Sequence, residues 1–571
     1  MKLRVSDLVV KFLEAVNVDF IFGIPGSQIC PLYDSLYSSS IRHVLVRHEQ
    51  SASYMADAYA KFTGKLGVCD GTGGPGATNL LTGIATAWTD STPVIVFTGQ
   101  QPLNYLGKGA FQEIDHVAIF SSITKWSTML VKPERTVEIL REAFKAATWG
   151  RPGPVHVDLP LNVQNQHIDF DEEKHFHGIT RILSPPNPCG DSHAIDRALE
   201  LLINSFRPVI IAGGGLHYSS RACKELMEFA EYLDIPVATT FNGRGSFPED
   251  NPLSIGRMGV HAPSFNDRIL AEADLIFAIG CRFAALSTRH WSNINPLAKL
   301  IHVDIDPKVI ERNYPVEVSI VGDAKKVLAK LLERVKELRE LGKEKRKEWL
   351  NFIERAKEEW RRSPWFTKSL SDNSLIKPHR VCIEIRKACS RETVFTLDAG
   401  NNKLWASTFL EIYEPYTWIQ SGCFGPMGYA IPAAIACRLA IGEYGRNVVA
   451  ICGDGGFYMS MHELSTSIQE KAPILICVFN DGALGTIKHH QRDSYGGRFI
   501  SVDLKNPSFA RIAEAFGCYG LSVEKLSQLR PALEEGLRTV KAGETTIIDI
   551  KIDGEEPLPP QLLSALICFN S

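Results

Sequence analysis

Residues 451–457 read Ile-Cys-Gly-Asp-Gly-Gly-Phe, and this stretch decides how the C-terminal part of the chain folds. The apolar run Val448–Cys452 leads into it and predicts a buried strand, and the residues that follow have the spacing of an amphipathic helix. A second apolar strand, Ile474–Asn480, comes after that helix and runs into Asp481. Strands that alternate with helices predict a parallel sheet in an α/β domain.

The glycines and carboxylates of this region suit a diphosphate and a metal ion. Glycine lets the backbone approach a diphosphate closely, and the N-terminus of the next helix favours negative charge. The Asp454 carboxylate is a hard oxygen ligand of the kind that Mg²⁺ prefers, and Asp481 would bring a second one to the same sheet edge. A Gly-Asp-Gly alone is usually only a turn. The whole pattern predicts a crevice for metal and diphosphate formed by Gly453, Asp454, Gly455, Gly456 and Asp481.

The same alternation of helix and strand occurs in two earlier regions. Residues 1–170 carry helical patterns at Val5–Val16 and Glu49–Thr63 and strand patterns at Asp19–Gly23 and Pro93–Thr98. Residues 190–345 hold buried-strand patterns near 208–212, 274–280 and 300–306, the first of which runs into three glycines. With the C-terminal region at 376–553, the sequence predicts an α/β fold of three doubly wound domains with parallel sheets.

Three further segments connect or follow these domains. A polar, proline-containing stretch at 164–192 predicts a linker. Residues 324–362 are dense in Lys, Glu and Arg with apolar residues at helical spacing, which predicts an exposed helical connector, and we assign 346–375 to it. Residues 554–571 form a weakly patterned tail.

Composition restricts the class of partner. The 571-residue chain has a formal net charge of −3, which argues against a nucleic-acid binder because such proteins need a basic face. A small-molecule partner is expected instead. Its 13 cysteines include no Cys-x-x-Cys pair, so we expect a reducing, cytoplasmic compartment. No apolar run of 18 residues occurs, so we expect neither a signal segment nor a membrane contact.

At these motifs the sequence resembles the thiamine diphosphate-dependent enzymes, whose signature is Gly-Asp-Gly followed, after a helix and a strand, by Asn-Asn. The second Asn of the family, a metal ligand, falls on Asp481, and the first falls on Asn480. Asp is also an oxygen ligand, so this departure makes the metal site more anionic. The resemblance implies that the backbone carbonyl of Ala483 completes the protein ligands of Mg²⁺.

The first domain matches the family independently. Residues 47–50, Arg-His-Glu-Gln, resemble the segment whose glutamate contacts the aminopyrimidine of the cofactor, which implies that Glu49 passes a proton to that ring. Taken alone, Glu49 would read as a surface residue at a helix start. Two glycine turns at 22–26 and 71–79 flank it and resemble segments of the same family. The resemblance therefore implies cofactor contacts from Pro25, Gly26, Thr72 and Asn79.

Two more segments of the C-terminal domain resemble family turns. Residues 398–402 and 421–428 match, respectively, a polar turn after a strand and a Gly-Ala-Met-Gly segment. In the family the methionine of the second segment is a wedge that bends the cofactor, and here it is Met427. The resemblance implies cofactor contacts from Gly400, Asn401, Asn402, Gly425 and Met427.

Within this family the chain is most similar to the acetolactate synthase large subunit over nearly its whole length. The resemblance implies that Phe111 and Gln112 face the reacting carbon, that a 2-keto acid such as pyruvate is decarboxylated and joined to an acceptor, and that the enzyme serves branched-chain amino acid biosynthesis. Two positions depart: Leu286 replaces an arginine that would anchor a carboxylate, and His490, beside His489, replaces a tryptophan. Two histidines suit acid–base work or an anionic acceptor.

These departures keep several alternatives open. The chain could transfer an acyl group to phosphate, like sulfoacetaldehyde acetyltransferase or pyruvate oxidase, or be a simple 2-keto acid decarboxylase. From another class, it could be a non-catalytic coenzyme-binding module. FAD is also left open, since the glycines of the FAD-binding segments are present while Ala284 and Ala285 replace acidic residues. The resemblance implies a homodimer or homotetramer with active sites at subunit interfaces, and it leaves a small regulatory subunit open.

Overall fold

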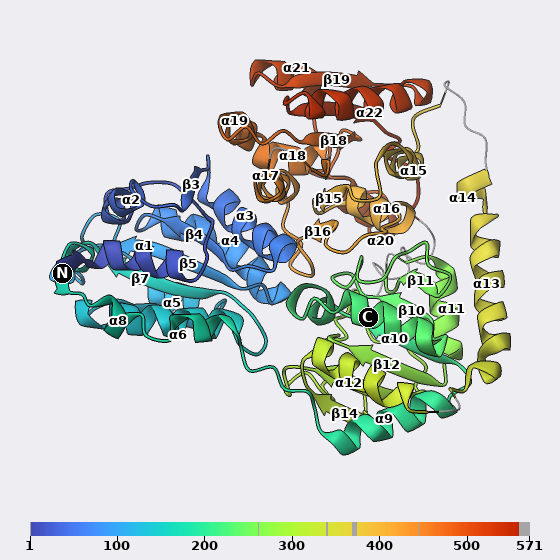
Figure 1. Cartoon of the computed structure of the whole chain (residues 1–571). Helices are drawn as coiled ribbons and strands as arrows, with labels where there is room; N and C mark the ends of the chain where they lie inside the picture. The colour runs from blue at the N-terminus through green and yellow to red at the C-terminus, as the bar shows by residue number, and fades with distance from the viewer. Residues whose placement is uncertain (1, 261, 339–340, 368–373, 443–444, 559–571) are drawn as a thin grey trace. The chain divides into compact units, whose positions relative to one another are not determined.

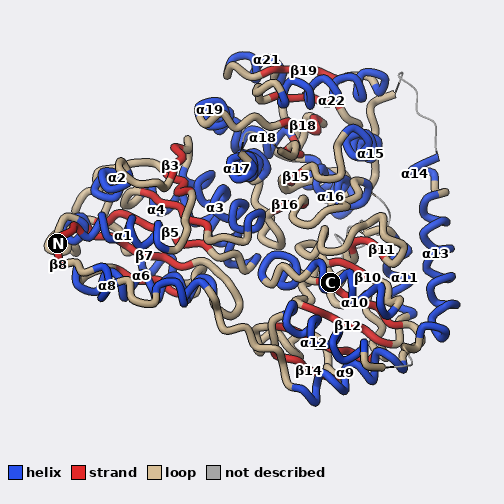
Figure 2. The backbone as a smooth tube through the Cα atoms, in the orientation of Figure 1, coloured by secondary structure: helices blue, strands red, loops and turns tan. Residues whose placement is uncertain are grey.

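The computed structural model describes residues 2–260, 262–338, 341–367, 374–442 and 445–558. Contacts within the chain divide it into two compact units. Unit 1 comprises residues 1–186, 424–444 and 460–472, and unit 2 comprises residues 187–423, 445–459 and 473–571. Three six-stranded sheets, whose strands are red in Figure 2, form the framework of these units. None of the described helices is long and apolar enough to cross a membrane.

The sheet of unit 1 has six parallel strands in the order β3-β2-β4-β5-β7-β6. All residues of β5 (Val94–Gln100) are buried, as is typical of a parallel sheet that helices cover on both faces. The other strands are β2 (Phe20–Gly23), β3 (Arg42–Leu45), β4 (Gly67–Gly71), β6 (Trp126–Met129) and β7 (Val155–Pro160). The helices between them, blue to cyan in Figure 1, are α1 (Val5–Ala15), α2 (Cys30–Leu36), α3 (Glu49–Thr63), α4 (Pro75–Asp90), α5 (His116–Ser121) and α6 (Thr136–Thr148).

Unit 2 contains two sheets, and the first lies in the central part of the chain. Its six parallel strands have the order β11-β10-β9-β12-β13-β14. These strands are β9 (Pro208–Ala212), β10 (Val237–Thr239), β11 (Ser254–Arg257), β12 (Leu275–Ile279), β13 (Lys299–Asp304) and β14 (Val318–Val321). The helices of this region are α9 (Ser192–Asn204), α10 (Cys223–Leu233), α11 (Ser264–Glu272), α12 (Ala324–Lys336) and α13 (Lys347–Arg361).

The second sheet of unit 2 is built from the C-terminal part of the chain. Its parallel strands have the order β16-β15-β17-β18-β20-β19. They are β15 (Val394–Leu397), β16 (Trp418–Gln420), β17 (Val448–Gly453), β18 (Leu475–Asn480), β19 (Tyr519–Val523) and β20 (Thr546–Lys551). The helices are α15 (Pro378–Ala388), α16 (Asn401–Phe409), α18 (Asp454–Ser460), α20 (Gly485–Ser494), α21 (Phe509–Ala515) and α22 (Leu526–Lys541). The predicted fold of three α/β domains with parallel sheets is confirmed.

Strand order places the glycine motifs at corresponding points of the sheets. Counted in chain order, the strands of the unit 1 sheet and of the C-terminal sheet follow the same sequence, 2-1-3-4-6-5. The direction of winding changes between β2 and β4 in one sheet and between β15 and β17 in the other. Ligands of open α/β sheets bind where this change opens a crevice at the carboxyl ends of the strands. The turns at 22–26, 71–79, 398–402 and 453–456, which resemble cofactor-binding turns, follow these four strands.

The predicted linker at 164–192 is partly wrong. The short strand β8 (His167–Asp169) pairs antiparallel with β1 (Lys2–Arg4), so that Leu3 lies opposite Ile168. Ile179 and Ile182 are also buried in the core of unit 1. Most of this segment is therefore part of unit 1, and its longest stretch without helix or strand is residues 184–191.

The predicted exposed connector is also corrected. The described residues within 324–362 include two helices, α12 and α13, and each of them buries an apolar face. Leu328 and Leu331 of α12 belong to one core of the central sheet, and Trp349 and Ile353 of α13 belong to the other. The abundant charges lie on the opposite faces of both helices, which is why the composition resembled a solvated connector. Of the predicted tail at 554–571, residues 559–571 lie outside the described residues.

A buried ion cluster joins three helices of unit 1. The Lys61 ammonium of α3 lies 2.8 Å from Asp57 and 2.7 Å from Asp90 of α4, and all three side chains are almost fully buried. The Tyr429 hydroxyl, one residue before α17 (Ala430–Ile441), donates to the Asp57 carboxylate over 2.6 Å. Removing the cation would leave two carboxylates buried beside each other.

We therefore expect Lys61→Met to destabilise unit 1 by about 3–5 kcal/mol, the range for breaking a buried ion pair. The measurement is the midpoint of thermal unfolding. Lys65→Met is the matched control, because the Lys65–Asp19 pair is exposed and such pairs contribute at most about 1 kcal/mol. Equal, small shifts in both variants would contradict the assigned role of the cluster.

Candidate active site

Asp454 is held in one orientation at the switch point of the C-terminal sheet. It is the first residue of α18, directly after β17, and it is 2% exposed. One carboxylate oxygen accepts from the Gly455 amide at 2.9 Å, and the other accepts from the Gly482 amide at 2.9 Å. Asn506 donates to that second oxygen over 2.7 Å. These donors fix the carboxylate at the carboxyl edge of the sheet, and its role as a metal ligand stays a prediction.

Asp481 supplies a second carboxylate at the same edge. It directly follows β18, and its side chain accepts from the Ala483 amide at 3.2 Å. Burial and the neighbouring Asp454 carboxylate raise the pKa of Asp481 to about 7, and burial raises the pKa of Asp454 as well. Two adjacent carboxylates that resist ionisation in this way fit a site that binds a cation.

The donor set of this edge matches Mg²⁺ better than a softer metal. The two predicted side-chain ligands are both carboxylates, and Ala483, the third predicted ligand, would contribute only a backbone oxygen. Among the described residues no group of three or more His, Cys, Asp or Glu side chains is placed to hold a metal. Mg²⁺ commonly keeps several waters and takes substrate or cofactor phosphates as ligands. A diphosphate beside Asp454 and Asp481 would complete such a shell.

Asn506 is a residue of this site that sequence reasoning missed. Its amide donates both to Asp454 and, over 2.9 Å, to the side-chain oxygen of Asn480. Asn480 in turn donates to Asp549 on β20 at 2.7 Å. A chain of amides thus links the aspartate after β17 to the neighbouring strands. No motif marks Asn506 in the sequence, because it lies in an irregular segment 52 residues from Asp454.

The predicted residues after β15 have two different surroundings. Gly400 has φ of 122°, a conformation that favours glycine. The Asn401 side chain accepts from the Thr486 hydroxyl at 2.9 Å, and it lies toward Asp481, since a side chain at Gly485 would contact both residues. Asn402 instead donates to the carbonyls of Asp398 and Ile451, each at 3.2 Å, and so joins the ends of β15 and β17.

His489 is oriented by both ring nitrogens. Its Nε2 donates to the Gly554 carbonyl at 2.7 Å, and Nδ1 lies 3.4 Å from the Asn401 amide, which can donate to it. Burial lowers the pKa of His489, so the ring is neutral at pH 7. The catalytic role of His489 stays a prediction, and its contacts also suit a second role, which is to position the Asn401 side chain. His490 is half-buried, with Nδ1 3.2 Å from the Ser494 hydroxyl.

The glycines around Asp454 differ in how tightly their surroundings restrict a side chain. A side chain at Gly456 would come within 2.6 Å of the Asp398 carboxylate, so only glycine lets α18 begin there. At Gly453 a side chain would make only an ordinary contact with Asn402. The Gly455 amide is one of the donors to Asp454. Close approach of the backbone is thus required at Gly456 by the fold itself.

Unit 1 gathers the second set of predicted residues around Glu49. This glutamate is the first residue of α3 and is 8% exposed, and the helix N-terminus favours its negative charge. Asn79 donates to the Glu49 carboxylate over 2.9 Å. A side chain at Gly76 would contact Glu49 at 3.4 Å, and one at Gly26 would overlap Thr72. Glu49, Gly26, Thr72 and Asn79 therefore form one cluster at the switch point of this sheet.

The remaining predicted residues of unit 1 lie in loops. Gln112, with φ of 61°, packs against Gly74 of the turn after β4, where an added side chain would come within 2.9 Å of it. Phe111 beside it is 76% exposed, and Pro25 is also exposed. Gly425, with φ of 62°, precedes Met427, whose carbonyl lies 3.4 Å from the Tyr54 hydroxyl of α3. The loop of Met427 is thereby attached to the helix that carries Glu49.

The glycines that resemble FAD-binding segments have a packing role. The Gly213 amide donates to Ile279 and the Gly215 amide to Gly280, at 2.9 and 3.0 Å. A side chain at Gly213 would overlap the Gly280 carbonyl. These glycines let the ends of β9 and β12 lie together, with or without a flavin. His261, in the second segment that resembles an FAD-binding one, 259–261, lies outside the described residues.

Comparison with known families agrees with this arrangement. The family description "Thiamine pyrophosphate enzyme, N-terminal TPP binding domain" matches residues 3–119. The central domain of the same family matches residues 195–331, and its C-terminal TPP binding domain matches residues 398–550. This chain belongs to the thiamine pyrophosphate enzyme family. The predicted enzyme class and its cofactor, thiamine pyrophosphate (thiamine diphosphate), are confirmed, and the reading as a non-catalytic module is set aside.

Several curated relatives of this chain are named acetolactate synthase large subunits. A protein of Methanocaldococcus jannaschii named "Probable acetolactate synthase large subunit" is 40% identical over 97% of this chain and 93% of its own length. A protein of Methanococcus aeolicus with the same name is 37% identical over 97% of this chain and 92% of its own length. The acetolactate synthase large subunit of Corynebacterium glutamicum is 40% identical over 92% of this chain and 83% of its own length. The predicted similarity to this group is confirmed.

Proposed function

We propose that this thiamine pyrophosphate enzyme uses Mg²⁺ to decarboxylate a 2-keto acid such as pyruvate and to join the remaining fragment to a second keto acid. The observation that carries the proposal is the pair of aspartates, Asp454 and Asp481, at the carboxyl edge of the C-terminal sheet beside its switch point. The names of the relatives support the second half of the reaction.

In this proposal Asp454, Asp481 and the Ala483 carbonyl hold Mg²⁺, and Asn401 lies beside them. Thiamine pyrophosphate, when bound, supplies an electron sink for the bond that breaks when CO2 leaves. Asn506 and the Gly455 and Gly482 amides keep the Asp454 carboxylate aimed at the metal position. A ligand whose orientation is fixed in advance loses little entropy when the metal arrives.

Glu49 acts as the proton-transfer residue. Its carboxylate lies at a helix N-terminus and accepts one hydrogen bond from Asn79, which leaves the other oxygen for the aminopyrimidine of the cofactor. Gly26, Thr72 and Gly76 keep the space beside it free of larger side chains. Met427, Phe111 and Gln112 complete the proposed surroundings of the reacting atoms.

The proposal includes an oligomer. As in the resembled family, Glu49 of one subunit would serve the metal site of another, in a homodimer or homotetramer. Domain boundaries at 1–170, 190–345 and 376–553 belong to the proposal as well. The relatives are named large subunits, which supports a small regulatory subunit as a further partner. FAD is left outside the proposal, because Gly213 and Gly215 are explained by packing.

A second candidate is acyl transfer to phosphate. Leu286 stands where the resembled family has an arginine for the carboxylate of the acceptor. His490, which replaces the family's tryptophan, is half-buried and lies edge-on to Tyr495 with the ring centres 5.3 Å apart. An imidazole in that position suits an anionic acceptor better than an apolar one.

Product analysis separates these candidates. With pyruvate, Mg²⁺ and thiamine pyrophosphate, we expect acetolactate as the main product, and we expect added phosphate to leave the product unchanged. Acetyl phosphate in the presence of phosphate would favour the second candidate, and acetaldehyde alone would indicate a simple decarboxylase. The control is the same incubation with Glu49→Gln, which should form none of these products at a comparable rate.

A further inference from the structure

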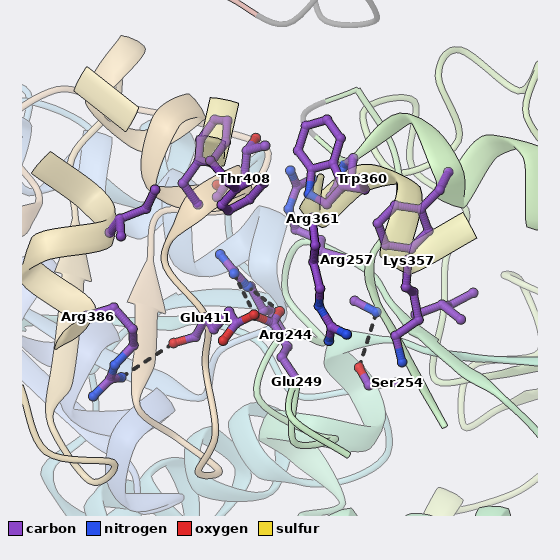
Figure 3. A pocket seen from close by; sticks show the side chains of 18 of the residues that line it. Arg244, Glu249, Ser254, Arg257, Lys357, Trp360, Arg361, Arg386, Thr408 and Glu411 are labelled. Carbon is purple, nitrogen blue, oxygen red and sulfur yellow. Dashed lines mark hydrogen bonds and ion pairs between the residues drawn. The ribbon is translucent and has the colours of Figure 1, made fainter. Parts of the chain in front are cut away.

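A cavity of about 260 Å³ lies in unit 2, away from the residues proposed for catalysis. Three parts of the chain line it: residues 244–265 of the central region, the end of α13 with Phe366, and residues 383–413 around the end of α16. Pockets for drug-sized ligands measure about 300–1,000 Å³, so this cavity suits a smaller molecule. Figure 3 shows it from close by.

Cationic side chains outnumber acidic ones in its lining. They are Arg244, Arg257, Lys357, Arg361, Arg386 and Lys387, against the two carboxylates of Glu249 and Glu411. Arg244 and Glu249 neutralise each other in a two-point pair with distances of 2.7 and 2.8 Å. The Glu411 carboxylate accepts from the Tyr413 hydroxyl at 2.7 Å. Just outside the lining, Glu354 lies 3.5 Å from Lys357 and 3.6 Å from Arg361, and Glu384 lies 3.3 Å from Lys387. Six cations against these four carboxylates still leave positive charge in excess around the cavity.

Several of these cations are taken out of water. Arg257 is 2% exposed, Lys357 is 7% exposed and Arg386 is 8% exposed. Lys357 donates to the Pro252 carbonyl at 3.0 Å, and Arg386 donates to the carbonyls of Cys389 and Ser390. Burial lowers the pKa of all three groups. Lys357 also lies 3.5 Å from the half-exposed Glu354 carboxylate. Carbonyl dipoles compensate a buried cation only in part, and an anion in the cavity would stabilise all three cations.

The cavity also has an aromatic side and an unused hydroxyl. Trp360 and Phe409 lie with their ring planes 28° apart, and Phe366 meets Trp360 edge-on. Phe265 is a further aromatic residue of the lining. Ser407 lines the cavity and is 2% exposed, and its hydroxyl has no hydrogen-bond partner among the described residues. A ligand that forms a hydrogen bond with this buried hydroxyl would remove the cost of leaving it without a partner.

We propose that this cavity binds a small organic anion in which a carboxylate or phosphate group is joined to an aromatic ring. The anionic group would lie among the cations of the lining, Arg257, Lys357, Arg361 and Arg386, where guanidinium groups can form two-point hydrogen bonds. The ring would pack against Trp360 and Phe409. In Figure 3, Arg257, Lys357 and Trp360 lie on one side of the pocket and Arg386 with Glu411 on the other. The site does not depend on the reaction proposed above.

Calorimetric titration of the full-length protein, saturated with Mg²⁺ and thiamine pyrophosphate, tests the site. The probes are phenyl phosphate and phenylacetate, which distinguish the two kinds of anionic group. Inorganic phosphate and benzyl alcohol are the controls for the anion alone and the ring alone. We expect at least one ring-bearing anion to bind with Kd below about 1 mM, and about tenfold more tightly than either control.

Variants on α13 assign that binding to the cavity, because this helix carries none of the residues proposed for catalysis. Lys357→Met and Arg361→Gln should each weaken binding about tenfold, the effect of losing one charge-assisted contact. Arg361 is more than half exposed, so its variant should fold even if Lys357→Met does not. Lys347→Met, at the far exposed end of α13, should bind like the original protein. No binding below about 1 mM, or binding by both Lys357→Met and Arg361→Gln as tight as by the original protein, would overturn the proposal.

Discussion

Replacing Glu49 with glutamine is expected to lower the turnover of pyruvate by about 10²–10⁴-fold, the usual contribution of a positioned acid–base group. Glutamine has nearly the same shape and can still accept the hydrogen bond from Asn79, so the cluster of unit 1 should keep its structure. The glutamine amide cannot give up or take up a proton near pH 7. The loss should therefore appear in kcat, while the thermal unfolding midpoint stays within about 1 °C of the original, since ΔΔG of a few tenths of a kcal/mol shifts it little.

The matched control is Glu138→Gln on α6. Glu138 is an exposed glutamate of the same unit that pairs with Arg135 one turn away, and its replacement should leave kcat unchanged. A Glu49→Gln protein that kept more than about a tenth of the original kcat would remove Glu49 from proton transfer. A large fall in the unfolding midpoint would instead show that the carboxylate mainly stabilises the start of α3.

Local patterns were enough to place some of the strands of each of the three sheets. The expected helix at Glu49–Thr63 is α3, and the expected strands near 208–212, 274–280 and 300–306 correspond to β9, β12 and β13. Parallel strands that are buried on both faces leave continuous apolar runs, and these are readable without a structure. Glycine turns after such runs then indicate the carboxyl edge where a ligand can bind.

Distant pairing explains the errors. Residues His167–Asp169 form β8 because they pair with Lys2–Arg4. The sequence of 164–192 alone does not indicate that pairing. The same holds for α12 and α13, whose charged faces dominate the composition while Leu328 and Trp349 reach the core of a sheet. Amphipathic periodicity says that a helix has an apolar face, but the partner that covers it depends on the tertiary fold.

Within the candidate site, the residues that the sequence identified are those that belong to motifs. Asp454, Asp481, Glu49 and Asn79 do lie in two clusters, one in each unit. Their supporting partners were not predictable, because Asn506 and the hydrogen bonds of His489 depend on loops that the motifs do not include. The sequence predicted a catalytic role for His489. In the structure its ring contacts Gly554 and Asn401, and these contacts also suit a residue that positions Asn401.

The second large effect is expected at the metal position. Asp454→Asn should reduce the affinity for Mg²⁺ in the presence of thiamine pyrophosphate by at least about 100-fold, because changes even in the partners of metal ligands cost 10–100-fold. Asparagine has nearly the same shape as aspartate but only one acceptor oxygen. It can therefore keep the hydrogen bond from the Gly455 amide or the one from the Gly482 amide, but not both in their present geometry. Calorimetric titration with Mg²⁺ and the magnesium dependence of turnover both measure the loss.

Asp481→Asn supplies the contrast, because it places at this position the residue that the resembled family carries. An amide oxygen remains a ligand for Mg²⁺, and the repulsion that raises the pKa of Asp481 beside Asp454 disappears. We therefore expect a loss of Mg²⁺ affinity of less than about tenfold, clearly smaller than that of Asp454→Asn. If the two variants lost affinity equally, the pair would be acting only through its total charge. If neither did, Mg²⁺ would bind elsewhere, and the switch point of the C-terminal sheet would have to hold the diphosphate without a metal.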